Sequence, residues 1–273
     1  MAVERIYSAD DPRVAGYRDL RDGELVRSRG LFVAEGRLVV RRLVEDGRYD
    51  LQSVLVNDAA LRHLESAIAV LGAGVPVFVC DSEELAGIAG YDVHRGCLAL
   101  VQRRPPTTAD ELIASAQTLV ILEAVSNADN VGGVFRNAAA FDAGGVLLSP
   151  TCCDPLYRKA IRTSMGATLR VPFSRAGTDD WPIVLTRVRA AGFTIVALTP
   201  RAPSETLEAF AARPRAPRIA LTVGTEGAGL TPAVEAAADY RVRIPIAARV
   251  DSLNLAVAAG IALHALRLGP PNT

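Results

Sequence analysis

The chain has 273 residues, half of which are apolar, and its formal net charge at pH 7 is zero. This length predicts about two small domains, and the apolar content is enough for a buried core in each, which excludes a disordered chain. There is no run of about eighteen apolar residues and no apolar leader, so we expect a cytoplasmic protein that is neither membrane-bound nor secreted.

Charge and cysteine usage narrow the choice of partners. Acidic residues outnumber basic ones over 1–117 and the reverse holds over 118–273, so a polyanion would favour the second part of the chain. Cys80, Cys97, Cys152 and Cys153 lack the spacing of a metal site, and we expect small buried thiols and no bound metal.

The first hundred residues alternate between helical and strand-like patterns. Helices are predicted at 11–20, 36–47, 58–71 and 82–89, and strands at 31–34, 51–56, 75–80 and 96–101. This alternation predicts a small α/β/α sandwich over residues 1–104. The prolines Pro105 and Pro106 then interrupt regular structure, so residues 105–117 are predicted to be a linker.

The pattern restarts in a second predicted domain, residues 118–273. Strands are predicted at 119–122, 146–148, 169–173, 193–198, 219–223 and 240–246, and helices at 130–141, 155–164 and 179–191, with a last, almost wholly apolar helix that begins at an N-cap Ser252. Residues 201–218 are expected to be an ordered loop around a short helix. Strands that alternate with helices predict a mostly parallel α/β sheet.

A glycine-rich turn, Gly224 to Gly229, follows the apolar strand at 219–223. In open α/β sheets, ligands bind outside the carboxyl ends of strands, where glycines let the backbone approach closely. The turn is a weak signal by itself and does not identify a ligand.

Three segments together carry a resemblance. Motif one (127–140) holds Asn130, Gly132 and Arg136; motif two (224–230) reads Gly-x-Glu-Gly-x-Gly-Leu; motif three (244–258) holds Ile244-Pro245 and Ser252-Leu253-Asn254. In this order and spacing they resemble the SpoU (TrmH-type) RNA 2′-O-ribose methyltransferases of the SPOUT superfamily. The chain departs from the family pattern before Asn130, where Asn127-Ala128-Asp129 replaces Asp-Pro, and after Asn254, where Leu255-Ala256 replaces Val-Ser.

The resemblance implies a fold, a cofactor and an assembly. It implies a trefoil knot in the second domain, a homodimer, and S-adenosylmethionine held by the main chain at Gly224, Ile244 and Leu253, with Leu198 and Thr199 at a neighbouring strand end. Knots are so rare that sequence physics alone would not predict one. The first domain resembles a ribosomal-protein-like RNA-binding domain, most closely at Phe32 to Arg37, although Glu35-Gly36 is also explained as an ordinary strand-to-helix turn.

The catalytic residues implied by the resemblance are Asn130, Arg136, Glu226, Ser252 and Asn254. A planar guanidinium at Arg136 suits bidentate binding of the phosphate beside the reacting ribose. The family role of general base fits less well, because a guanidinium normally stays charged unless a partner relays the proton. From the residues alone, Arg136 is better explained as a surface arginine on an amphipathic helix.

The other candidate residues carry similar alternatives. Glu226 would order the loop or hold Arg136, or would simply be solvated, and Asn254 would lie with Ser252 beside the ribose, or be a satisfied buried amide. Arg158, Lys159 and Arg162, with Arg37, are candidates for RNA phosphates, or form a solvated helix face.

The interpretation is an S-adenosylmethionine-dependent RNA 2′-O-methyltransferase, with rRNA favoured over tRNA and the target nucleotide unreadable. Two alternatives stay open at this point. A dinucleotide-dependent oxidoreductase would use similar architecture, but G-x-G-x-x-G is absent. A non-catalytic RNA-binding protein would have kept the fold and lost the chemistry, which the joint presence of all five candidate catalytic residues disfavours.

Overall fold

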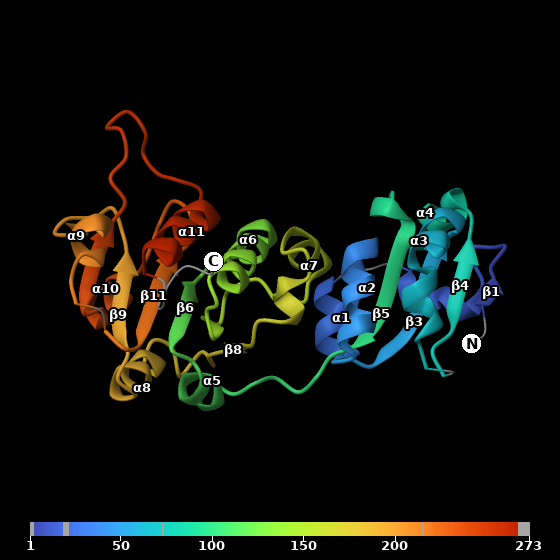
Figure 1. The fold of residues 1–273 in the computed structure, drawn as a ribbon, viewed down its shortest axis with the longest axis horizontal. Helices are drawn as coiled ribbons and strands as arrows, with labels where there is room; N and C mark the ends of the chain where they lie inside the picture. The colour runs from blue at the N-terminus through green and yellow to red at the C-terminus, as the bar shows by residue number, and fades with distance from the viewer. Residues whose placement is uncertain (1–2, 19–21, 73, 215, 267–273) are drawn as a thin grey trace. The chain divides into compact units, whose positions relative to one another are not determined.

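The computed structural model describes residues 3–18, 22–72, 74–214 and 216–266. The chain divides into two compact units (Figure 1). The first unit consists of Met1–Pro105 and Asp154–Leu169, and the second of Pro106–Cys153 and Arg170–Thr273. Both are α/β, as predicted, but the first takes a segment from far along the chain.

The first unit is built on a five-stranded mixed sheet in the order β1-β4-β3-β5-β2. Its strands are β1 (Val3–Arg5), β2 (Leu31–Glu35), β3 (Leu51–Asn57), β4 (Val77–Cys80) and β5 (Cys97–Gln102). Its helices are η1 (Pro12–Tyr17), α1 (Asp22–Ser28), α2 (Arg37–Asp46), α3 (Asp58–Ala69), α4 (Ser82–Ala89), η2 (His94–Gly96), α7 (Arg158–Thr163) and η3 (Ala167–Leu169). The strand β5 is antiparallel to β3 and β2, and the other pairs are parallel.

Helices cover both faces of this sheet. On one face, η1, α1 and α4 contribute Tyr17, Leu25 and Leu85 to a core cluster with sheet residues such as Leu55 and Leu98. The helices α2 and α3 pack on each other and on β5 and β3. The α/β/α sandwich predicted from the sequence is therefore confirmed.

The second unit is built on a seven-stranded, entirely parallel sheet in the order β10-β12-β9-β11-β6-β7-β8. Its strands are β6 (Thr118–Glu123), β7 (Gly145–Leu148), β8 (Phe173–Arg175), β9 (Thr194–Leu198), β10 (Glu205–Thr206), β11 (Ile219–Gly224) and β12 (Tyr240–Arg243). Its helices are α5 (Ala109–Ser115), α6 (Ala128–Ala140), α8 (Val184–Ala190), α9 (Leu207–Ala211), α10 (Pro232–Ala237) and α11 (Leu255–Leu266).

Two helical layers also enclose the parallel sheet. The helices α5, α8 and α10 share one core cluster with alternate strand residues, among them Ile121, Ile195 and Ala220. The helices α6 and α11 lie side by side (Figure 1), and they pack on β7 and β11 respectively. Successive side chains of a strand point to opposite faces, and helices cover both faces, so the central strands β6, β7, β9 and β11 are largely apolar.

Several elements begin or end away from the predicted positions. A strand was predicted at 169–173, but β8 begins only after Pro172, which has no amide hydrogen to donate. The helix predicted from Asp179 begins at Val184, because Pro182 disfavours helical backbone at the residue before it. The expected linker at 105–117 contains α5, which the Thr108–Glu111 capping box begins.

All four cysteines are buried free thiols, as expected. Burial raises the pKa of the Cys80 thiol to about 12 and that of Cys97 further, so neither forms a reactive thiolate at neutral pH. In the part of the chain that the structure describes, no cluster of three metal-ligating side chains occurs, and no helix has the length and apolarity needed to cross a membrane.

Candidate functional site

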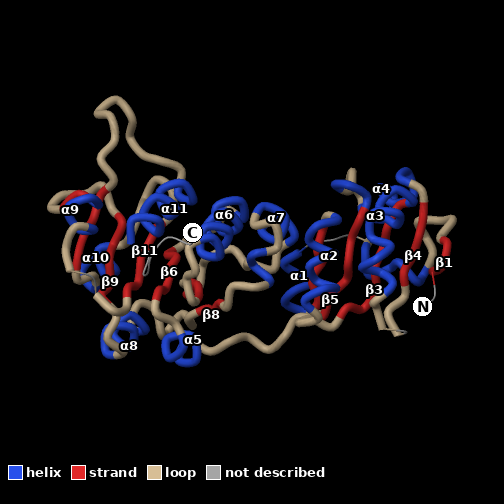
Figure 2. The backbone as a smooth tube through the Cα atoms, in the orientation of Figure 1, coloured by secondary structure: helices blue, strands red, loops and turns tan. Residues whose placement is uncertain are grey.

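A pocket of about 450 Å³ lies in the second unit, at the carboxyl ends of β9, β11 and β12. The loop 244–254, which joins β12 to α11, forms much of its wall and is seen as a long segment without helix or strand (Figure 2). All five residues predicted to hold a cofactor line this one pocket, namely Leu198, Thr199, Gly224, Ile244 and Leu253. Segments far apart in sequence therefore meet where the parallel sheet predicts a ligand.

The motif-two loop, Gly224–Leu230, folds back on the end of β11. The amide of Gly229 donates to the carbonyl oxygen of Thr225 at 3.0 Å. A Cβ atom at Gly224 would lie 2.3 Å from the carbonyl carbon of Gly229, so no larger residue fits there. The loop needs a glycine at this position to close, and closure brings its backbone to the pocket wall.

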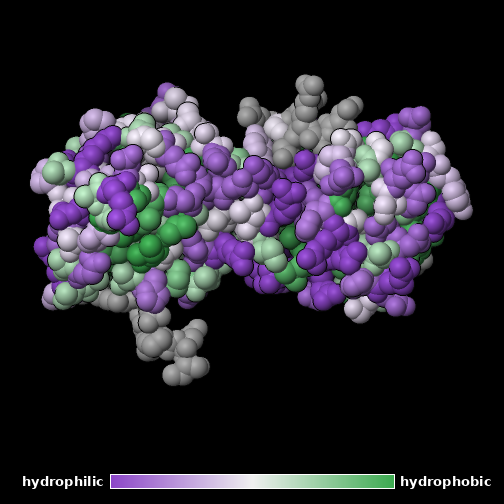
Figure 3. Space-filling model, turned by 90° about the horizontal axis from the view of Figure 1, so that it is seen from above, coloured by the Kyte–Doolittle hydropathy of each residue, from purple (hydrophilic) through white to green (hydrophobic). Residues whose placement is uncertain are grey.

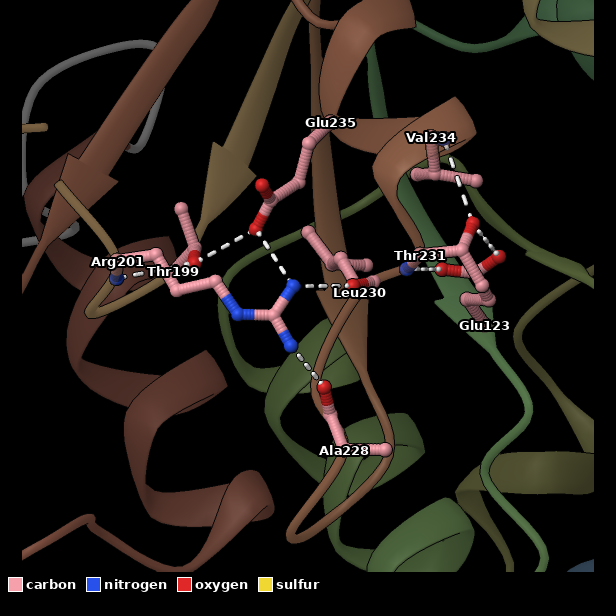
Figure 4. A network of polar contacts seen from close by, with 8 residues as sticks. All are labelled: Glu123, Thr199, Arg201, Ala228, Leu230, Thr231, Val234 and Glu235. Atoms are coloured by element: carbon pink, nitrogen blue, oxygen red, sulfur yellow. Dashed lines mark hydrogen bonds and ion pairs between the residues drawn. The ribbon is translucent and has the colours of Figure 1, made fainter. Parts of the chain in front are cut away.

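Polar contacts anchor the returning arm of this loop from two sides (Figure 4). Arg201 donates to the carbonyl oxygens of Ala228 and Leu230 and pairs with the carboxylate of Glu235. The Glu235 carboxylate also accepts from Thr199 Oγ1 at 2.9 Å. The loop is thereby tied to the end of β9.

On the other side, the buried carboxylate of Glu123 accepts from the amide and the hydroxyl of Thr231, each at 2.8 Å. Trp181 Nε1 donates to the same carboxylate at 3.3 Å. Apart from Thr199, which was predicted to hold the cofactor, none of these anchoring residues was singled out in the sequence. The sequence did hold a signal for two of them, because a carboxylate in an apolar segment needs a partner. Glu123 ends an otherwise apolar strand, and Glu235 lies within an apolar helix.

Asn254 joins the three motifs. Its Nδ2 donates to Asn130 Oδ1 at 2.9 Å and to Glu226 Oε1 at 3.1 Å. Its Oδ1 accepts from the amides of Ala256 and Val257 at 3.0 and 3.2 Å, the contacts of an N-cap residue. The prediction that Ser252 caps the last helix is therefore wrong. Ser252 is exposed and lines the pocket, and Glu226 contacts Asn254 instead of Arg136 or the loop amides.

The two departures from the family pattern have local explanations. Asn127 caps α6 by accepting from the amide of Asp129 at 2.8 Å, as an aspartate would. The methyl group of Ala256 faces α6, where a Cβ atom on Gly133 would approach it to 2.6 Å. Asn137 on α6 donates to the carbonyl oxygen of Ala256 at 2.6 Å. Position 256 thus belongs to the α6–α11 contact.

Arg136 lies on α6 with its side chain exposed, and among the described residues it makes no hydrogen bond or ion pair. The structure therefore brings together Asn130, Glu226 and Asn254, with Ser252 on the pocket wall, but does not join Arg136 to them.

The predicted RNA-binding arginines have protein partners within the first unit. Arg158 and Arg162 pair with the buried carboxylate of Glu35 at 3.4 and 3.5 Å, and Arg158 also stacks over the ring of Tyr91. Arg37 donates to the carbonyl oxygen of Arg95 at 2.9 Å, and Lys159 is exposed. Glu35 is thus more than an ordinary turn residue, since it holds α7 on the sheet.

The model of the SpoU rRNA Methylase family matches residues 117–264, which contain all three motifs. The chain belongs to this family. Among SpoU relatives, an uncharacterized tRNA/rRNA methyltransferase of Mycobacterium tuberculosis (strain ATCC 25618 / H37Rv) is 38% identical over 266 residues, covering 96% of this chain and 91% of the relative. A similarly described protein of Synechocystis sp. is 26% identical over 97% of this chain and 94% of its own length.

Solved SpoU-type structures share the fold of the whole chain. An AdoMet-bound rRNA methyltransferase from Sinorhizobium meliloti has a TM-score of 0.80 and 28% identity, and the match covers 97% of both chains. An RNA 2′-O ribose methyltransferase has a TM-score of 0.76 and 26% identity over 96% of this chain and 97% of its own. The protein is accordingly an RNA methyltransferase of the SpoU family.

Proposed function

We propose that this protein transfers the methyl group of S-adenosylmethionine to a ribose 2′-hydroxyl of RNA. The observation that carries the proposal is the junction of the three motifs at one pocket, through the contacts of Asn254 with Asn130 and Glu226. Similarity to an AdoMet-bound rRNA methyltransferase and to an RNA 2′-O ribose methyltransferase supports both the cofactor and the ribose target.

The pocket suits S-adenosylmethionine in size and chemistry. Its volume of about 450 Å³ falls in the range of small-molecule sites, about 300–1,000 Å³. Leu198, Ile244 and Leu253 provide apolar walls, while Glu226 and Asp251 provide negative charge for a cationic ligand. Gly224 allows the main chain to approach the ligand closely.

The cofactor supplies an electrophilic methyl group, and the chain must place the ribose oxygen against it and accommodate its proton. Asn254 is held by four hydrogen bonds and directly follows Ser252 and Leu253 of the pocket wall, so it offers a fixed group against which the ribose is placed. Ser252 stands beside it with a free hydroxyl among the described residues. Methyl transfer would release S-adenosylhomocysteine, leave an O-methyl group on the ribose and pass the ribose proton to solvent.

Arg136 is proposed to bind the phosphate beside the reacting ribose. Its exposed guanidinium is available for an external anion, and its planar fork matches two phosphate oxygens. A guanidinium stays protonated at neutral pH, and a protonated group cannot accept the ribose proton. We therefore assign Arg136 to positioning the phosphate and not to removing the proton.

The first unit is proposed to bind the RNA, and rRNA is the favoured substrate over tRNA. The candidates for contacts with RNA phosphates are Arg37, Arg158, Lys159 and Arg162; Lys159 is exposed, whereas Arg158 and Arg162 already pair with Glu35. The trefoil knot and the cytoplasmic location also stay predictions.

A homodimer is the proposed assembly. Val257 and Ile261 on α11 are 52% and 41% exposed, and Ile246 and Val250 on the loop 244–254 are exposed as well. Apolar surface gathers on the second unit in the view of Figure 3. A helix that is apolar nearly all round needs cover on this side, and a second copy of the chain would provide it.

Two measurements test the proposed activity. S-adenosylhomocysteine at about 100 times its dissociation constant should stabilise the protein by about 2.7 kcal/mol, whereas NAD(H) should give no thermal shift. Mapping of 2′-O-methyl groups in RNA from cells with and without the gene should then find one nucleotide that loses its methyl group. Ligand binding without any lost methyl group would favour the non-catalytic alternative and contradict the proposal.

A further inference from the structure

Arg201 lies three residues after Leu198, the last residue of β9. Leu198, Thr199 and Pro200 all line the pocket. It is absent from the set of described residues that line the pocket itself. We infer that Arg201 is a positioning residue, which holds the motif-two loop in the shape that binds the cofactor. This inference rests on the proposed function, since it concerns the same pocket.

The geometry of the guanidinium supports this role (Figure 4). One nitrogen donates to the carbonyl oxygen of Leu230 at 2.8 Å and lies 3.5 Å from Glu235 Oε1, while the other donates to the carbonyl oxygen of Ala228. The two carbonyls belong to the returning arm of the loop, the arm that Gly224 must accommodate. A planar fork can bridge them in one fixed orientation, which a lysine ammonium cannot do.

Glu235 fixes the fork in turn. Its side chain is only 8% exposed, and the same oxygen accepts from Thr199 Oγ1. The amide of Arg201 donates to that hydroxyl at 3.2 Å, so Thr199, Arg201 and Glu235 form a closed group. This group connects two walls of the pocket, the end of β9 and the motif-two loop.

Loss of the guanidinium would leave two loop carbonyls and a buried carboxylate without this partner, while the pocket-lining side chains would stay unchanged. The loop would then need water or a new conformation to satisfy these groups. Glu226 is in the same loop and contacts Asn254, so displacement of the loop would reach the junction of the three motifs.

Arg189 provides a matched control. It pairs with Asp239 at 2.9 Å and donates to the carbonyl oxygen of Ala237 at 2.6 Å, and its side chain is 48% exposed against 47% for Arg201. It lies in the same unit, on α8, and does not contact the motif-two loop in the described residues. The two arginines thus differ chiefly in which segment they hold.

The experiment compares Arg201→Met, Arg201→Lys and Arg189→Met by calorimetric titration with S-adenosylhomocysteine and by amide hydrogen exchange. Arg201→Met should weaken binding about tenfold, Arg201→Lys should recover part of the loss, and Arg189→Met should bind within about twofold of wild type. In the absence of ligand, amide hydrogen exchange over residues 225–229 should be faster in Arg201→Met than in wild type, and unchanged in Arg189→Met.

Equal loss of binding in Arg201→Met and Arg189→Met, or unchanged exchange over 225–229, would overturn the inference. A third outcome would also overturn it: Arg201→Met binds S-adenosylhomocysteine as wild type does, but binds RNA more weakly and with a smaller salt dependence. Arg201 would then contact RNA directly. If wild type itself bound no S-adenosylhomocysteine, the proposed function would fail, while the exchange measurement would still decide whether Arg201 holds the loop.

Discussion

Asn254 Nδ2 lies 2.9 Å from Asn130 Oδ1, although 124 positions separate the two residues in the chain. The same Asn254 amide also contacts Glu226 and caps α11, so both its hydrogens and its oxygen are used. Motif one, motif two and motif three are thus held in register by a single side chain. This arrangement allows the structural and catalytic roles of Asn254 to be separated by substitution.

Asn254→Asp should keep the helix cap and lose the junction. A carboxylate still accepts from the amides of Ala256 and Val257, and negative charge suits a helix N-terminus. It cannot donate to Asn130, and it places a second negative charge beside Glu226. We expect a melting temperature near that of wild type and methyl transfer reduced at least about tenfold.

Asn254→Ala is the paired variant, because it removes the cap together with the junction. It should lose about 1 kcal/mol of stability as well as activity. Measurement of urea unfolding and of single-turnover methyl transfer on both variants distinguishes the two roles. Wild-type transfer by Asn254→Asp would show that the contact with Asn130 is dispensable.

Substitution of Arg136 tests the phosphate contact. Arg136→Ala removes the charge and Arg136→Lys keeps the charge without the fork, so both should reduce methyl transfer strongly. Affinity for S-adenosylhomocysteine should barely change, because Arg136 is not among the described residues that line the pocket. RNA affinity should fall only modestly, with a salt slope reduced by about one. Normal turnover by the lysine variant would refute bidentate binding, and normal turnover by the alanine variant would exclude Arg136 from the mechanism.

Gly224→Ala should disrupt the pocket. The added methyl group would meet backbone atoms of Gly229 and Leu230 within 2.5 Å, and backbone cannot move aside as a flexible side chain can. We expect a loss of about 1–3 kcal/mol in stability, by analogy with overpacked sites, and loss of S-adenosylhomocysteine binding in titration calorimetry. Gly177→Ala is the control, since its nearest neighbour would be Asp180 Cβ at an ordinary 4.0 Å. If Gly224→Ala bound ligand normally, the tight return of the motif-two loop would not matter for the pocket.

The proposed dimer can be tested on α11. Val257→Lys combined with Ile261→Lys places two charges on the exposed apolar side of the helix, so it should convert a dimer into a monomer by light scattering at micromolar concentration. Ile183→Lys is the control, because Ile183 is 62% exposed but lies before α8. A wild-type monomer, or a dimer unaffected by the double substitution, would contradict this assembly.

The fold followed from local patterns where those patterns were strong. Buried strands such as Leu119–Leu122 are continuous apolar runs, and α4 matches its predicted limits, 82–89, because Asp81 caps its start and Gly90 ends it. The helix α5 was missed because Pro105, Pro106 and the polar residues after them are typical of linkers. The capping box at Thr108 and Glu111 was a local signal for the helix, and the burial of Leu112 and Ile113 in the core agrees with it.

The glycine-rich turn after the strand at 219–223 indicated where a ligand would bind, and the resemblance supplied the individual site residues. The contacts that support the site were not predicted, because they join residues that are far apart in the sequence. Nothing local distinguishes Arg201 from Arg189, and only the folded chain shows that one holds the motif-two loop and the other the end of α10. The sequence also did not decide whether Ser252 or Asn254 caps α11. The answer depends on the path of loop 244–254 along the pocket, which places Asn254 at the start of the helix.

The contribution of Asp154–Leu169 to the first unit limits how the gene can be divided. A product that starts at Pro106 would retain every pocket residue and the junction at Asn254, yet α7 would lose β2, on which it packs. Arg158 and Arg162 would lose Glu35, their shared counter-ion. The buried side chains of α7, Ala160 and Ile161, would lose the cover of the first unit. Exchange of the first unit between relatives therefore requires the transfer of two separate segments, the N-terminal portion and the short segment that contains α7.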